Sequence, residues 1–111
     1  MGPLSIIMAM TGVSYVVIGC VLQNHPPKKI NMWLGYRTSR STSSQRHWDF
    51  AQVYSSKKMV QSGAYLILGA VVGHFMRLEE MHAVYLGLAM VLVFSFIPII
   101  LTERALHLLD E

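Results

Sequence analysis

The stretch AVYLGLAMVLVFSFIPIIL, residues 83–101, contains no Lys, Arg, Asp or Glu. A helix needs about 20 apolar residues to cross the roughly 30 Å of hydrocarbon in a bilayer. Two further runs have the same character, one before Lys28 and one over residues 59–76. Three such runs leave little of a 111-residue chain for a water-soluble core. The sequence therefore predicts an all-α membrane protein, a single module over residues 1–111, with transmembrane helices at about 4–23, 58–77 and 83–103.

Composition agrees with a chain made mostly of membrane spans. Hydrophobic residues make up 53% and charged residues 14%, against about 25% charged in an average soluble domain. No basic residues precede the first apolar run, and no small-residue cleavage pattern closes it, so we expect an uncleaved helix. The single cysteine, Cys20, lies within that run and cannot form an internal disulfide.

The basic residues are concentrated between the first and second spans. Seven of the nine Lys and Arg lie there: Lys28, Lys29, Arg37, Arg40, Arg46, Lys57 and Lys58. Basic loops stay on the cytoplasmic side, which predicts an external N-terminus and a cytoplasmic C-terminus. Because topology explains these charges, we expect no nucleic-acid partner.

Small residues recur at helical spacing within the spans. Ser5, Gly12 and Gly19 follow one another every seven residues, and Ala83 precedes Gly87 by four. Gly69 and Gly73 have the G-x-x-x-G spacing at which helices pack closely in lipid. We therefore predict helix packing at Gly12, Gly19, Gly69, Gly73 and Gly87, within a bundle, a homo-oligomer or a larger membrane complex.

The passage NMWLGYRTSRSTSSQRHW, residues 31–48, is polar and basic between apolar runs. Thr42 followed by Gln45 fits a capping box, which starts a helix. Beyond it, an apolar stripe with helical spacing predicts an amphipathic helix at about residues 43–55, on the cytoplasmic side. Its members are His47, Phe50, Ala51 and Tyr54, with Gln45, Asp49, Gln52 and Ser56 on the other side. The helix either lies along the membrane surface or continues directly into the second span.

The same passage holds the candidate site residues. Its glycine can adopt positive φ, its arginine can bond several carbonyls with a planar fork, and its hydroxyls can close turns. These residues either organise the loop or bind a partner: Asn31, Gly35, Arg37, Thr38 and Trp48. We favour the organising role for Asn31, Gly35 and Arg37, with a shielded guanidinium. Amphipathic aromatics favour the headgroup level, which predicts membrane-interface anchoring for Trp33, Tyr36 and Trp48.

Candidate catalytic and metal-binding sets are weak. Ser44, His47 and Asp49 are the residue types of a hydrolase triad, but residues two apart on a helix do not face each other. His74 and His82 flank the outer turn with Glu79 and Glu80, without the fixed geometry of a metal site. We expect no catalytic residue, no metal and no cofactor.

The spacing Asn31-x-x-x-Gly35-x-Arg37-Thr38, followed by Trp48, resembles the signature of the SdpI family. The resemblance covers roughly residues 27–69. It implies a non-enzymatic protein of the bacterial cytoplasmic membrane that gives immunity to a membrane-active peptide toxin. It also implies that such a protein holds a cytoplasmic repressor at the membrane. The alternative function is a structural or assembly subunit of a larger bacterial membrane complex.

Overall fold

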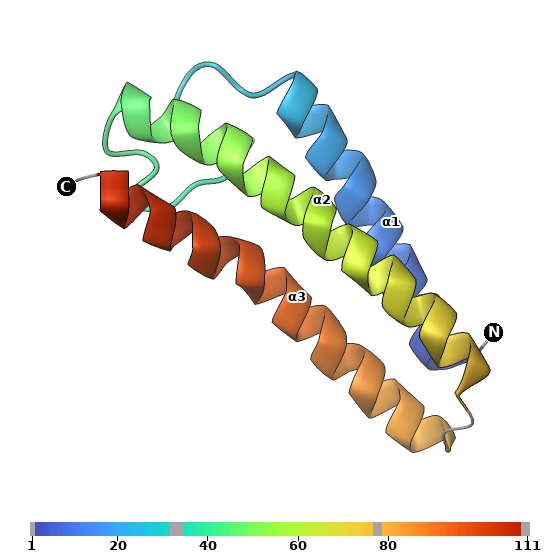
Figure 1. Ribbon diagram of the computed structural model, residues 1–111. Helices are drawn as coiled ribbons and strands as arrows, with labels where there is room; N and C mark the ends of the chain where they lie inside the picture. The colour runs from blue at the N-terminus through green and yellow to red at the C-terminus, as the bar shows by residue number, and fades with distance from the viewer. Residues whose placement is uncertain (1, 32–34, 77–78, 110–111) are drawn as a thin grey trace.

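The computed structural model describes residues 2–31, 35–76 and 79–109, and these residues form three α-helices (Figure 1). The helices are α1 (Pro3–Asn24), α2 (Gln45–Phe75) and α3 (Glu80–Leu109). At 1.5 Å of rise per residue, α2 and α3 are each about 45 Å long, close to the longest dimension of 49 Å. The prediction of an all-α protein is confirmed.

Two of the helices have the length and composition of membrane spans. These are α1 over residues 4–24 and α3 over its full length. Large apolar side chains on α3 are exposed, among them Leu92, Phe96 and Ile100. Soluble monomers rarely expose apolar surface on this scale, so lipid is the natural surrounding of this face. The chain is a membrane protein.

The segment predicted as two helices, 43–55 and 58–77, is the one continuous helix α2. Of the two arrangements that the sequence left open, the amphipathic segment therefore continues into the helix that follows it. Lys57 and Lys58 lie within α2 and do not interrupt it. The other helices also extend beyond the predicted spans, α1 by one residue at each end and α3 to Leu109, past the span predicted to end near residue 103.

The start of α2 differs from the predicted capping box. The N-cap is Ser44, whose Oγ accepts a hydrogen bond from the backbone N–H of His47 at 3.1 Å. The hydroxyls of Thr42 and Ser43 instead donate to the carbonyls of Thr38 and Arg40. Thr42 is not the cap because its hydroxyl already closes the preceding turn.

α1 and α2 pack antiparallel through small residues on both helices (Figure 1). Ser5 donates a hydrogen bond to the carbonyl of Ala70 at 2.9 Å. A Cβ on Gly12 would lie 2.7 Å from the carbonyl oxygen of Gly63, and one on Gly19 would lie 2.9 Å from that of Ser56. The partners Ser56, Gly63 and Ala70 repeat every seven residues, as Ser5, Gly12 and Gly19 do. Matched repeats bring the two backbones together along the whole contact.

The remaining predicted packing glycines surround the start of α1. Gly69 faces the side chain of Met8, and Gly73 faces that of Leu4. A Cβ on Gly87 would lie 3.3 Å from the Cα of Leu4, so α3 also approaches α1 here. The buried apolar core lies at the same place and consists of Leu4, Met8, Leu66, Ala70 and Ala83.

Candidate functional site

The polar loop lies at the end of the bundle where α1 and α3 end and α2 begins (Figure 1). It enters its described part at Gly35, whose φ of +97° is the only positive value among the described residues. L side chains rarely adopt this conformation. A Cβ at Gly35 would also collide with the side chains of Gln52 and Pro27. Both facts explain why glycine is needed here.

Gln52 holds the backbone of Tyr36 by both the oxygen and the nitrogen of its side-chain amide. Its Oε1 accepts from the Tyr36 N–H at 2.7 Å, and its Nε2 donates to the Tyr36 carbonyl at 2.8 Å. Gln52 is 2% exposed, although an isolated buried amide is costly. The pair of bonds satisfies the amide and fixes the loop against α2.

A compact turn follows, built around Thr38 and Ser41. The buried Ser41 Oγ accepts from the Thr38 N–H at 2.7 Å, and Thr38 Oγ1 accepts from the Ser41 N–H at 3.2 Å. The Ser41 hydroxyl also donates a hydrogen bond to the carbonyl of Tyr36 at 3.2 Å. Among the described residues, every buried side-chain nitrogen and oxygen has a hydrogen-bond partner. The loop is thus an ordered structure rather than a plain linker.

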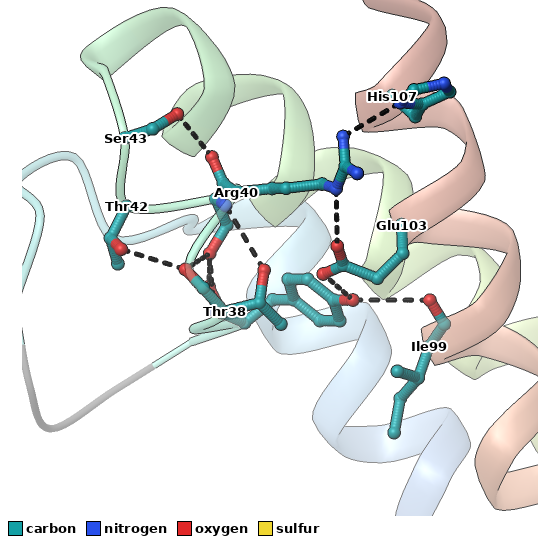
Figure 2. Close-up of polar contacts among 9 residues, drawn as sticks. Thr38, Arg40, Thr42, Ser43, Ile99, Glu103 and His107 are labelled. Carbon is teal, nitrogen blue, oxygen red and sulfur yellow. Dashed lines mark hydrogen bonds and ion pairs between the residues drawn. The ribbon is translucent and has the colours of Figure 1, made fainter.

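The loop is joined to α3 by an acid–base cluster, which Figure 2 shows in close-up. The Tyr36 hydroxyl donates to Glu103 Oε1 at 2.7 Å. Arg40 extends toward α3 between Glu103, whose Oε2 lies 3.7 Å from its Nε, and His107, whose Nδ1 lies 3.0 Å from an Arg40 terminal nitrogen. Burial, and then the hydrogen bond to Glu103, raise the pKa of Tyr36 well above its ordinary value.

The first part of the loop is tied to the start of α2. The indole N–H of Trp48 donates to the carbonyl of Pro27 at 2.7 Å, and Gln45 donates to that of Lys28 at 2.6 Å. Trp48 is completely buried. The predicted role of Trp48 as a membrane-interface anchor is therefore wrong, because its ring packs inside the protein and its polar group binds the chain. Its predicted role in organising the loop agrees with this contact.

The other candidates differ in their surroundings. Asn31 is half-buried and donates to the carbonyl of Lys29 at 2.8 Å. Tyr36, predicted at the membrane interface, is half-buried with its hydroxyl on Glu103. Arg37 is exposed, contrary to the shielding that we expected. Trp33 lies outside the described residues.

Two pockets flank this loop. The first has a volume of about 570 Å³ and lies between the three helices, under residues 35–38. The second, of about 600 Å³, is bordered by loop residues including Asn31 and Ser39. Arg37 and Thr38 line both pockets.

Of the residues considered for catalysis, Ser44 and His47 contact each other, whereas Asp49 bonds a different residue. Ser44 Oγ lies 2.5 Å from His47 Nδ1, while the carboxylate of Asp49 accepts from Gln45 at 2.7 Å. Asp49 is thus directed to Gln45 and not to His47, as the helical spacing requires. Within residues 2–31, 35–76 and 79–109, no three His, Cys, Asp or Glu side chains gather as a metal site would need.

Sequence reasoning missed two residues that organise the site, namely Gln52 and Glu103. Gln52 was assigned to the polar side of an amphipathic helix, yet the buried side of α2 here consists of Trp48, Ala51, Gln52 and Ser56. Trp48, Gln52 and Ser56 are spaced by four residues, a pattern that could have indicated a buried stripe. It was overlooked because two of the three are polar.

The fold and site define a small helical membrane protein with an ordered basic loop at one end of its bundle. The sequence model of the SdpI/YfhL protein family matches residues 28–102. An uncharacterized protein of Bacillus subtilis (strain 168), YfhL, is 33% identical over 97 residues, which cover 86% of this chain and 82% of YfhL. No solved structure has significant similarity to the chain. The chain belongs to the SdpI/YfhL family.

Proposed function

We propose that the protein is a non-enzymatic immunity protein that protects the cytoplasmic membrane of a bacterium from a membrane-active peptide toxin. Family membership over residues 28–102, which include the whole described loop from Gly35, is the observation that carries this proposal. Immunity is the role for which the family is named. Binding rather than catalysis is supported by a site whose polar groups bond one another.

The proposal places three spans in the membrane, including α2. α2 follows α1 from Ser56 to Ala70 through backbone contacts, so a bilayer that contains α1 also contains this part of α2. The basic loop then lies on the cytoplasmic side and the turn between α2 and α3 outside. The loop is the face available to a cytoplasmic repressor, and the outer turn and the span faces are available to the peptide.

The alternative, an assembly subunit of a larger membrane complex, has less support. It was motivated by the small residues of the spans. Gly12, Gly19 and Gly63 are engaged within the chain, where neighbouring backbone or side chains leave no room for a Cβ. They therefore do not need a second protein to explain them.

Deletion of the gene from its own host tests the immunity role. The deletion strain, the parent and a strain complemented with the wild-type chain are exposed to conditioned medium from the parent. Survival and membrane potential are measured with a potential-sensitive dye. We expect rapid depolarisation of the deletion strain alone, and rescue by the chain.

A variant carrying Gly35→Val tests whether rescue requires the correctly formed loop and not merely expression of a chain. Because this position requires positive φ and has no room for a Cβ, the variant should fail to rescue, whereas the exposed change Gly2→Val should rescue fully. A deletion strain as resistant as its parent would overturn the immunity proposal.

A further inference from the structure

The pocket between the three helices is mostly apolar inside, where Ser55, Ser56 and Ser95 add hydroxyls, and polar at the loop. Ile18 and Leu22 of α1, Met59 of α2, and Pro98 and Ile99 of α3 supply its apolar lining. Its volume of about 570 Å³ lies within the range of ligand sites, about 300–1,000 Å³. Ile18 and Ile99 are 48% and 42% exposed, so the pocket reaches the apolar outer surface of the bundle. A molecule in the surrounding lipid can enter it from the side.

The polar end of this pocket carries positive charge. Arg37 and Thr38 line both this pocket and the second pocket, which is also bordered by Ile30, Asn31, Ser39 and Thr42. A guanidinium can bond two phosphate oxygens at once, and a threonine hydroxyl can add a further contact. The two pockets together therefore offer an apolar space and a cationic, hydroxyl-rich space that share Arg37.

The surface around the two pockets is also positively charged. Exposed basic residues at this end of the bundle include Lys28, Lys29, Arg40, Arg46, Lys57 and Arg104. Of the acidic residues near the loop, Glu103 already accepts from Tyr36 and faces Arg40, and Asp49 accepts from Gln45. Clusters of basic residues next to a membrane span attract anionic lipids, and basic pockets between spans bind their headgroups.

We propose that the chain binds one anionic phospholipid of the surrounding leaflet, with an acyl chain between the helices and the phosphate at Arg37 and Thr38. The lipid would fill the space between α1, α2 and α3 at the end where the loop separates them. It would thereby couple the position of the loop to the composition of the membrane. This role is independent of toxin immunity.

Native mass spectrometry of the detergent-purified full chain tests the proposal. Phosphatidylglycerol and phosphatidylcholine with the same acyl chains are added separately over a range of concentrations. We expect one tightly bound phosphatidylglycerol and weaker binding of phosphatidylcholine. Loss of the charge-assisted contact in Arg37→Ala should weaken phosphatidylglycerol binding about tenfold, whereas Arg46→Ala removes the same charge from the surrounding surface but from neither pocket and should weaken it much less.

A second pair of variants examines the apolar part. Ile18→Trp should fill the pocket and reduce the binding of both lipids, while Val17→Trp, at a neighbouring exposed position outside the pocket lining, should not. If Arg37→Ala does not fold, the comparison of Ile18→Trp with Val17→Trp still tests whether a lipid occupies the pocket. Equal affinity for the two lipids would overturn the proposal, and so would equal losses in Arg37→Ala and Arg46→Ala. Unchanged binding by Ile18→Trp would likewise contradict it.

Discussion

Gln52 is a buried amide that serves the backbone of Tyr36 as a neighbouring strand would. Its acceptor and donor bond the N–H and the carbonyl of the same residue, at 2.7 and 2.8 Å. The loop has no helix or sheet of its own to satisfy these groups. The Gln52 side chain therefore bonds both groups, and the Ser41 hydroxyl adds a second donor to the carbonyl.

Replacement of Gln52 by leucine should destabilise the protein. The change leaves an N–H and a carbonyl of Tyr36 without this partner, at about 1–3 kcal/mol for each group that stays buried. Thermal unfolding in detergent micelles measures the loss. Gln61→Leu makes the same change at an exposed position of α2 and should be nearly neutral. Equal melting temperatures for the two variants would show that the amide does not hold the loop.

Tyr36 gives the loop a pH dependence at the alkaline end. Its raised pKa means that the neutral hydroxyl is favoured in the folded state, chiefly by burial and then by Glu103. The stabilisation is complete below the unfolded value of about 10 and declines as pH rises toward the higher folded value, because the unfolded chain loses its proton first.

The variant Tyr36→Phe should therefore be less stable than wild type near neutral pH, by about 1 kcal/mol for the lost hydrogen bond. Its deficit should shrink above about pH 10. Melting temperatures of both proteins across this range provide the measurement. A deficit that stays constant with pH would contradict the role given to the hydroxyl.

Part of the helical structure was predictable from the sequence, and part was not. Charge-free runs predicted α1 and α3, because a span in lipid tolerates few charges. The joining of residues 43–55 to the next helix was not predictable, since Lys57 and Lys58 neither break nor favour a helix by themselves. In the loop, the need for glycine at position 35 was predictable from residue type, whereas residue type placed Trp48 at the membrane interface and the structure buries it. Gln52 and Glu103 were missed because their bonds to Tyr36 span 16 and 67 residues.

The contact between α1 and α2 predicts which glycine is least replaceable. A Cβ on Gly63 would lie 2.6 Å from the carbonyl oxygen of Gly12, and backbone cannot move aside as a side chain can. Gly63→Leu should lower the stability in detergent by about 1–3 kcal/mol or more. Gly69→Leu should cost less, because Gly69 faces the flexible side chain of Met8.

Ala64→Leu is the matched control, since Ala64 is the exposed neighbour of Gly63 on the same helix. It adds one carbon fewer, directed toward lipid, and should leave the melting temperature unchanged. Equal melting temperatures for Gly63→Leu and Ala64→Leu would show that close packing at Gly63 does not stabilise the contact between α1 and α2.

The bundle has two chemically different ends. The loop with its basic residues and the C-terminal end of α3 lie at one end, and the start of α1 and the junction of α2 with α3 lie at the other (Figure 1). Seven of the nine Lys and Arg of the sequence belong to the segment between α1 and the apolar part of α2. Because basic segments are retained in the cytoplasm, this asymmetry predicts a cytoplasmic loop and an external N-terminus.

Single cysteines test that orientation in intact cells. In a Cys20→Ser background, the variants Ser39→Cys and Glu80→Cys place one thiol at each end of the bundle, both at exposed positions. An impermeant thiol reagent should label Glu80→Cys and should reach Ser39→Cys only after the membrane is permeabilised. Labelling of Ser39→Cys but not Glu80→Cys in intact cells would reverse the topology, and the basic loop would then face the toxin rather than the cytoplasm. Labelling of both would show that α2 does not cross the bilayer, since α2 is the only helix between the two positions.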